Sequence, residues 1–195
     1  MVRRTRTDME QTRATLLETA RQVFSERGYG ETSMDDLTAQ ANLTRGALYH
    51  HFGDKKGLLA AVVAQIDAEM DARLHAISDT ASDPWEGFRN RCRAYLEMAR
   101  EPEIQRIVLR DGRAVLGAPT PQAQLNCVAS LRSMLEQLMA QGVVAQANPQ
   151  ALASLICGGL AETAFWIAEE GGQGQRLEQA LDAMELMLKG LRNPC

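Results

Sequence analysis

One short segment, residues 45–52 with the sequence RGALYHHF, carries side chains suited to binding nucleic acid. On a helical wheel at about 100° per residue, one arc is polar or without a side chain: Arg45, Gly46, Tyr49 and His50. The opposite arc is apolar apart from one imidazole: Ala47, Leu48 and His51. The first arc offers a guanidinium for guanine edges or phosphate, a bare backbone for close approach, and a phenol and an imidazole for backbone or base contacts. The segment has no acidic residue to repel a phosphate, so the pattern predicts a helix that lies in the major groove of DNA.

A preceding helix and a tight turn must hold this segment in place. The first helix should begin behind Thr32 or Ser33, whose hydroxyls can accept the amide hydrogens of an opening turn. It should end at Asn42, because asparagine enters left-handed backbone geometry at low cost. Thr44 can then cap the second helix, and a third helix should start at Asp54. Residues 32–56 are therefore predicted to form a helix-turn-helix.

The run of residues 24–59, FSERGYGETSMDDLTAQANLTRGALYHHFGDKKGLL, closely resembles the amino-terminal DNA-binding domain of the TetR family of transcriptional repressors. The residues in register are Gly28-Tyr29, Thr32-Ser33, Gly46, Leu48-Tyr49, His51-Phe52 and Lys55. Asn42-Leu43 stands where the family more often has Gly-Val, and asparagine tolerates the turn. The resemblance implies an all-helical, homodimeric repressor that a ligand releases from its operator, without implying which ligand. The alternative for this stretch is a helical hairpin that only packs.

A repressor of this kind makes further predictions about its DNA interface. Each DNA-binding domain should contribute phosphate contacts from Ser33, Thr44, His51 and Lys55. His51, on the inward arc, could equally be a packing histidine. The dimer would place its two recognition helices about one duplex turn apart, so the operator should be palindromic or nearly so. Its affinity should fall steeply with salt. A DNA-binding protein without sequence preference remains an alternative.

The charge of the chain favours a DNA partner only through its distribution. The formal net charge of the 195 residues is −4. Residues 1–60 hold nine Lys or Arg against eight acidic residues, whereas residues 61–195 hold 12 against 17. A basic tail could reach the DNA backbone or minor groove as a flexible arm, or could be an ordinary solubilising terminus: Arg3, Arg4, Arg6 and Arg13. No signal peptide opens the sequence and no stretch looks apolar enough to span a bilayer, so we expect a cytoplasmic protein with no membrane partner.

Enzymatic, metal and cofactor chemistry find little support in the sequence. There is no Ser, His and Asp set and no glycine-rich phosphate loop after a strand, so we expect no enzyme and no cofactor. Adjacent residues such as His50 and His51 diverge on a helix, and no cysteine or carboxylate stands at ligand spacing, so we expect no metal site. The four cysteines lie more than 25 residues apart, which argues against a disulfide framework: Cys92, Cys127, Cys157 and Cys195.

Helical periodicity continues through the whole chain and predicts an all-α fold of about nine helices. The predicted helices cover residues 8–27, the helix-turn-helix, 54–78, a segment from 84, 104–117, 121–141, 149–170 and 176–191. We divide the chain into a DNA-binding domain at 1–56 and an effector-binding and dimerisation domain at 57–195. The long third helix, 54–78, links the two domains, so motion at its far end would move the DNA-binding end.

A small-molecule site is predicted in the second domain. The candidate effector contacts are mostly apolar: Phe88, Cys92, Tyr95, Asp111, Val128, Leu131 and Trp166. Aromatic and apolar surface with few charges favours a hydrophobic or aromatic compound. Plain core packing is the alternative for these residues. Asp111 could instead cap a helix, pair with Arg93 or Arg110, or belong to an allosteric switch.

The last two helices, 149–170 and 176–191, carry more apolar surface than one small domain would cover. Gly158 and Gly159 would permit close approach, and the second helix has a coiled-coil-like seam. We therefore expect a two-fold interface of four helices from two chains, with an intramolecular bundle as the alternative. A repressor controlled by oxidation of Cys92 or Cys127 is a further alternative to ligand control, although buried free cysteines usually act as small hydrophobes.

Overall fold

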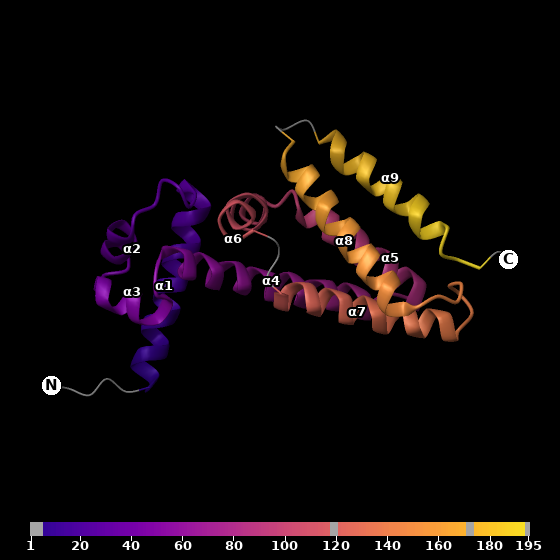
Figure 1. Ribbon diagram of the computed structural model, residues 1–195, viewed down its shortest axis with the longest axis horizontal. Helices are drawn as coiled ribbons and strands as arrows, with labels where there is room; N and C mark the ends of the chain where they lie inside the picture. Colours follow the sequence, from indigo (N-terminus) through magenta and orange to yellow (C-terminus); the bar gives the residue numbers. More distant parts are fainter. Residues whose placement is uncertain (1–5, 118–120, 171–173, 194–195) are drawn as a thin grey trace. The chain divides into compact units, whose positions relative to one another are not determined.

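The computed structural model describes residues 6–117, 121–170 and 174–193, and over these residues the chain is all-α (Figure 1). The chain divides into two compact units. The first contains Met1–Ile66 and Arg106–Ala118, and the second contains Asp67–Gln105 and Pro119–Cys195. The predicted all-α class is confirmed, with helices α1 to α9 and one π-helix among the described residues. The predicted functional boundary after residue 56 stays a prediction.

The first unit contains α1 (Arg6–Arg27), α2 (Met34–Gln40), α3 (Arg45–Phe52) and the start of α4 (Lys55–Asp79). Each of the first three helices contacts the other two. Their shared core is aliphatic and aromatic: Leu16, Leu17, Ala20, Val23, Phe24, Leu37, Leu48, Leu58 and Leu59. This core holds α3 so that its other face is open to solvent.

The turn chemistry predicted for this unit is present. Ser33 caps α2 by accepting a hydrogen bond from the Asp36 amide at 3.0 Å, and the Asp36 carboxylate accepts from the Ser33 amide in return. Asn42 has φ of 52°, as expected for the turn after α2. Thr44 caps α3 by accepting from the Ala47 amide at 3.2 Å. These caps fix where α3 begins and therefore which residues face outward.

The first unit also includes most of a π-helix, η1 (Ile104–Gly112), from Arg106 onward, followed by the short α6 (Arg113–Leu116). The sequence analysis predicted an ordinary helix over 104–117, because the apolar spacing of this segment does not distinguish i→i+5 from i→i+4 hydrogen bonding. Gly112 lies at the end of η1, where a Cβ would come within 3.0 Å of the Ile107 carbonyl oxygen. Because glycine has no Cβ, residue 112 can lie this close to the Ile107 carbonyl oxygen in the wider turn of the π-helix.

The second unit contains the rest of α4 with α5 (Pro84–Met98), α7 (Pro121–Ala140), α8 (Pro149–Ala168) and α9 (Gln175–Lys189). Asp83 caps α5 and Pro84 occupies its first turn, as predicted. Helix α5 contacts α7, α8 and α9, and α7 and α8 pack along each other. The core of this unit is formed mainly by α5, α7 and α8: Phe88, Cys92, Leu96, Leu131, Leu135, Leu138, Ile156 and Leu160.

Helix α8 differs from the expectation that no stretch could span a bilayer. By length and composition, Pro149–Ala168 is apolar enough to cross a membrane, and 39% of its most apolar window is buried. Its inward side belongs to the core of the second unit: Ala153, Ile156, Cys157, Leu160, Ala164, Ile167 and Ala168. A core helix passes the same test, so the apolar composition here is accounted for in part by packing against α7.

Candidate nucleic-acid interface and effector core

The α3 residues predicted to face DNA lie on the exposed side of this helix. Its exposed residues form one continuous face that starts at the cap: Thr44, Arg45, Gly46, Tyr49 and His50. Ala47 and Leu48 are buried, and the side chain of Tyr49 is 46% exposed. A Cβ at Gly46 would meet only the Thr44 hydroxyl, at 3.9 Å, so the backbone there lies open. The face combines donors, an aromatic ring and accessible backbone.

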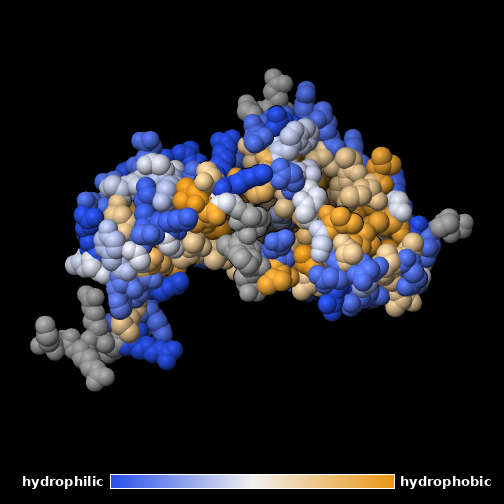
Figure 2. All heavy atoms as spheres, in the orientation of Figure 1, coloured by the Kyte–Doolittle hydropathy of each residue, from blue (hydrophilic) through white to orange (hydrophobic). Residues whose placement is uncertain are grey.

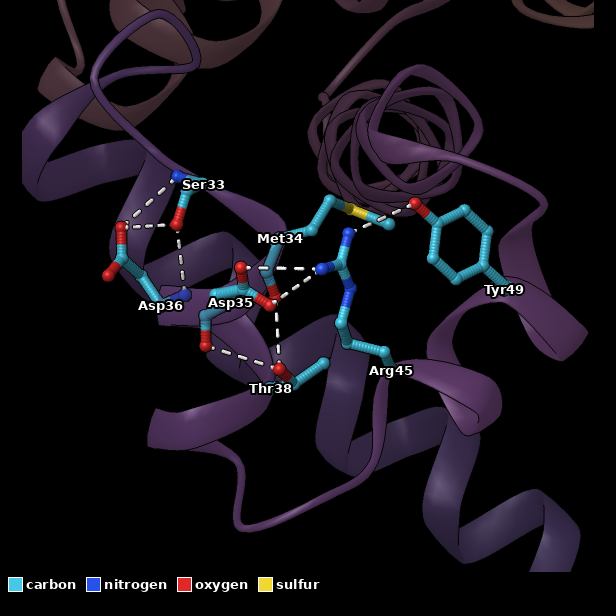
Figure 3. A network of polar contacts seen from close by, with 7 residues as sticks. All are labelled: Ser33, Met34, Asp35, Asp36, Thr38, Arg45 and Tyr49. Atoms are coloured by element: carbon cyan, nitrogen blue, oxygen red, sulfur yellow. Dashed lines mark hydrogen bonds and ion pairs between the residues drawn. The ribbon is translucent and has the colours of Figure 1, made fainter.

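Arg45 is held in position by an acidic residue that the sequence analysis did not place near it. Its guanidinium lies 3.2 Å from the Asp35 carboxylate of α2 and over the Tyr49 ring, with the two centres 5.9 Å apart (Figure 3). The Tyr49 hydroxyl hydrogen bond and the Asp35 charge raise the pKa of Arg45. The expectation of a surface free of acidic residues is therefore correct for α3 alone. When a duplex binds, the Arg45–Asp35 ion pair must break so that Arg45 can contact DNA, or the Asp35 carboxylate must itself accept a hydrogen bond from a base.

Ser33 and Thr44 serve first as helix caps, which limits what they can offer to a phosphate. The Ser33 hydroxyl donates to the Asp36 carboxylate at 2.7 Å while accepting from its amide (Figure 3). The hydrogen bonds from Ser33 lower the pKa of Asp36. The Thr44 hydroxyl accepts from the Ala47 amide, and its own hydrogen stays available to an acceptor. Of these two predicted phosphate contacts, only Thr44 has a hydroxyl hydrogen that is not already donated to a neighbouring side chain.

Lys55 has a structural role that the sequence analysis missed. Its Nζ donates to the carbonyl oxygens of Tyr29 at 2.8 Å and Thr32 at 2.7 Å. It also lies 4.0 Å from the centre of the Tyr29 ring. Two of its three N–H bonds are therefore used to hold the connection between α1 and α2. The predicted phosphate contact is left with the third N–H.

The two histidines of α3 differ in exposure. His50 is exposed and His51 is half-buried, with ring centres 5.2 Å apart in an edge-on arrangement. His51 also lies beside the Phe52 ring at 6.1 Å. This environment suits the packing alternative for His51 better than direct base contact. Over the described residues no group of three or more His, Cys, Asp or Glu is placed to hold a metal ion.

The basic tail falls partly outside the described residues. Arg3 and Arg4 lie there, so the arm predicted for them is not described. Arg6 pairs with Glu10 at 3.0 Å on the exposed side of α1. The Arg13 guanidinium lies 5.3 Å from the centre of the Phe52 ring. These contacts tie the two described arginines to the helical unit.

Five of the seven predicted effector residues lie on α5 and α7 of the second unit. Phe88 and Cys92 of α5 are buried, Tyr95 one turn later is half-buried, and Val128 and Leu131 are buried on α7. Since α5 contacts α7, these side chains form one apolar region. The structure is compatible with both the effector interpretation and plain core packing.

The other two predicted effector residues lie outside α5 and α7. Trp166 is 40% exposed on α8, and the Arg176 guanidinium lies 5.1 Å from its ring centre, so it belongs to the surface. Asp111 lies in the first unit, where its carboxylate accepts a hydrogen bond from the Tyr29 amide at 2.7 Å. This partner is the Tyr29 backbone and is neither Arg93 nor Arg110, the two partners considered from the sequence. The partner is 82 residues away, and no local pattern in the sequence could have identified it.

The cysteines also correct the sequence analysis. Cys127 of α7 and Cys157 of α8 form a disulfide, with Cα atoms 6.5 Å apart. Sequence spacing argued against disulfides, but packing of α7 along α8 brings these two residues together. Cys92 is free and buried, and burial raises the pKa of its thiol to about 12. Such a thiol is almost wholly protonated at neutral pH and is a poor nucleophile. Cys195 lies outside the described residues.

A capped helix pair that presents a polar, aromatic face from a three-helix core defines a helix-turn-helix DNA-binding protein. Comparison with known proteins agrees. Residues 16–62 match the model of bacterial regulatory proteins of the tetR family, and residues 85–191 match that of the tetracyclin repressor-like C-terminal domain. The chain belongs to the TetR family of transcriptional regulators.

Individual relatives support this assignment. The crystal structure of a TetR-family transcriptional regulator from Pectobacterium atrosepticum is 72% identical, with a TM-score of 0.93 over 98% of this chain and 99% of that one. A γ-butyrolactone receptor structure is 27% identical, with a TM-score of 0.58 over 94% of this chain and 89% of the other. The HTH-type transcriptional regulator TtgR of Pseudomonas putida is 38% identical over 71 residues, which are 36% of this chain and only 34% of that regulator.

Proposed function

We propose that this regulator is a cytoplasmic, homodimeric repressor that binds a palindromic operator through α3 and releases it when a small molecule binds in the second unit. The observation that carries the DNA-binding part is the open face of α3, where Arg45, Tyr49 and His50 project around the bare backbone of Gly46. Side chains of these types recognise base edges and phosphates in a major groove.

Selection of duplexes from a random pool tests this part of the proposal. We expect the wild-type protein to enrich a palindrome at about 150 mM salt. Tyr49→Ala should abolish the enrichment, because it removes the exposed ring from the centre of the face. Glu18→Ala, an equally simple truncation on the exposed side of α1, should enrich the same palindrome as the wild type. Loss of enrichment in both variants, or in neither, would contradict the assignment of α3.

The proposed dimer forms through α8 and α9. Large apolar side chains lie exposed on these two helices: Leu155 (73%), Trp166 (40%), Leu186 (73%) and Met187 (43%). Figure 2 shows apolar side chains gathered on the visible surface in the region of α8. Exposed apolar surface of this kind marks interaction sites in soluble proteins, and the two-fold symmetry of the expected operator requires a dimer.

Sedimentation velocity tests the dimer. Leu155→Glu combined with Leu186→Glu should convert the dimer to a monomer. Each chain would place two carboxylates in the apolar interface, which makes four negative charges per dimer. Leu125→Glu is the matched control, since Leu125 is 62% exposed on α7 and lies outside the proposed interface. A monomeric wild type, or a dimer that survives the double substitution, would refute this part.

The effector is proposed to be a small organic molecule with a large apolar portion. Support comes from the apolar region around Phe88, Cys92 and Leu131. The 27% identical γ-butyrolactone receptor is, by its name, a receptor for a small organic molecule, which also supports a small-molecule effector here. The effector would relieve repression by binding more tightly to the form whose DNA-binding domains are wrongly spaced.

A second candidate is repression controlled by oxidation, and the Cys127–Cys157 disulfide favours it. Disulfides are rare in the cytoplasm and are often redox-sensing there. Hydrogen peroxide would oxidise one thiolate to a sulfenic acid with release of hydroxide, and the second thiol would then attack the sulfenic sulfur, forming the disulfide and releasing water. Cys127→Ser should abolish any release of DNA by peroxide, and Cys92→Ser should not. Peroxide release that persists in Cys127→Ser would exclude this disulfide as the sensor.

A further inference from the structure

Helices α4 and α5 bring a row of polar side chains into the second unit. The short connection 80–83 makes the two helices run in opposite directions. The Arg91 Nη2 of α5 donates to the Asp71 carboxylate of α4 at 2.8 Å. Because α4 runs in the opposite direction, one turn before Asp71 should face one turn after Arg91. Those positions are Asp67 and Tyr95.

Polar atoms in this row have no partner within the described part of the chain. Arg91 is only 3% exposed, and its Nη1 is buried without a hydrogen bond. Asp67 and Tyr95, both half-buried, take part in no hydrogen bond or ion pair among the described residues. Of these groups, Arg91 Nη1 is the fully buried one. Buried polar groups are almost always paired, so Arg91 Nη1 points to a partner that is not part of the chain, and Asp67 and Tyr95 lie beside it with hydrogen-bonding capacity to spare.

The charges of the row do not cancel. Arg91 and Asp71 neutralise each other across their ion pair, and Asp67 is left with no counter-charge. His75 makes a longer contact with Asp71 at 3.7 Å, and its ring also meets the Ser130 hydroxyl of α7 at 3.2 Å. When Asp67 is ionised, the row has one uncompensated negative charge.

The electrostatics of Asp67 and Tyr95 agree with this arrangement. Burial raises the pKa of Asp67 to about 6. Burial and, secondly, the negative charge of Asp67 raise the pKa of Tyr95 to about 12. At neutral pH Asp67 is therefore mostly ionised, although burial opposes its charge, and an added positive charge would stabilise it. Tyr95 stays neutral and can donate or accept a hydrogen bond.

The apolar region described above continues directly from this row. Phe88, Cys92 and Tyr95 follow one another at helical spacing on α5, and the first two are buried. An occupant that reaches Asp67 with a polar group would place its remaining atoms against apolar side chains. The region therefore combines a negatively charged end with an apolar and aromatic wall.

We propose that Asp67, Arg91 and Tyr95 form a polar anchor for the effector, and that the effector is an organic cation: a protonated amine attached to an apolar or aromatic portion. The ammonium group pairs with the Asp67 carboxylate, the Tyr95 hydroxyl accepts a further N–H, and Arg91 Nη1 donates to an oxygen of the ligand where it has one. This inference rests on the proposed function, since it names the class of effector for the same site.

The test compares two probes of nearly equal shape by isothermal titration calorimetry at pH 7.5: 4-phenylbutylammonium and 4-phenylbutan-1-ol. We expect the wild type to bind the ammonium probe more tightly than the alcohol. Asp67→Asn should weaken binding of the ammonium probe by about 30-fold or more, because a buried charge pair is lost. The same variant should change binding of the alcohol by less than about threefold.

Asp79→Asn is the matched control, since Asp79 is an exposed carboxylate on the same helix. It should bind both probes as the wild type does. The ammonium preference should also weaken in Tyr95→Phe, which lacks only the hydroxyl. Equal binding of the two probes by the wild type, or an ammonium preference that survives Asp67→Asn, would overturn the anchor.

Failure of the anchor is distinguishable from failure of the proposed function. A wild type that enriches an operator, and releases it to the alcohol but not to the ammonium probe, refutes the anchor alone. A wild type that enriches no operator refutes the proposed function, whatever the titrations give. An ammonium probe that binds through Asp67 and also releases the enriched operator would support both.

Discussion

Lys55 provides a sharp test of the structure, because its observed and predicted roles differ. From the sequence we expect Lys55 to contact phosphate, whereas its Nζ donates to the carbonyl oxygens of Tyr29 and Thr32 at 2.8 and 2.7 Å. The perturbation is Lys55→Met, which retains most of the aliphatic chain and removes the ammonium group. Each hydrogen bond from a charged group contributes about 1.5 kcal/mol at the low end of its range, which suits a half-buried residue. We therefore expect a loss of about 3 kcal/mol in the free energy of unfolding.

Two measurements follow from that magnitude. Thermal unfolding followed by circular dichroism should show a decrease in Tm of about 6–12 °C for a chain of this size. Hydrogen exchange in peptides covering residues 24–40 should become about 100-fold faster, because the connection between α1 and α2 loses its clamp. Lys56→Met is the control, since Lys56 is exposed and adjacent in sequence, and it should change Tm by less than about 2 °C.

A structural role for Lys55 would be refuted if its substitution affected DNA binding and not stability. If Lys55→Met unfolds and exchanges as Lys56→Met does, yet binds DNA more weakly, then Lys55 acts on phosphate and not on the fold. A salt dependence of DNA binding that becomes shallower by about one unit in Lys55→Met alone would indicate the same.

Three further predictions follow from the geometry. Gly57→Ala should unfold the DNA-binding unit, because its Cβ would fall 2.0 Å from a backbone oxygen, whereas Gly46→Ala should keep the wild-type circular dichroism and melting curve; equal melting temperatures would contradict this. Asp35→Asn should release Arg45 and raise affinity for random-sequence duplex roughly threefold in fluorescence anisotropy, and unchanged affinity would show that the ion pair does not compete with DNA. Because the folded-state pKa of Asp67 is raised from 3.8 to about 6, its contribution to stability is present below about pH 4 and is lost, by roughly 3 kcal/mol in all, as pH rises through 6 to about 7; urea unfolding of Asp67→Asn should lack that decline, and parallel pH profiles would refute it.

The local chemistry of the DNA-binding unit could be predicted from sequence because each signal lies within a few residues of its effect. Ser33 and Thr44 cap helices whose first turns follow them directly, and Asn42 needs only its own backbone to make the turn. Helical periodicity likewise separated buried Leu48 from exposed Tyr49, since the two sides of a helix differ at fixed spacing.

Contacts between distant segments could not be predicted in the same way. Asp111 bonds to a backbone amide 82 residues away, and Cys127 meets Cys157 only once α7 packs along α8. Arg45 meets Asp35 through the angle between two helices, which a single-helix wheel does not contain. Each of these contacts depends on how helices pack, a property of the whole fold and not of any one segment.

Recognition of a DNA sequence by α3 is tested most directly by the ratio of two dissociation constants. The constants are those for the enriched palindrome and for a scrambled duplex of the same composition, measured by fluorescence anisotropy at about 150 mM salt. We predict that the wild type binds the palindrome about 1,000-fold or more tightly than the scrambled duplex, and that Tyr49→Ala loses most of this ratio while still binding both duplexes weakly. Equal affinity of the wild type for the two duplexes would contradict the account.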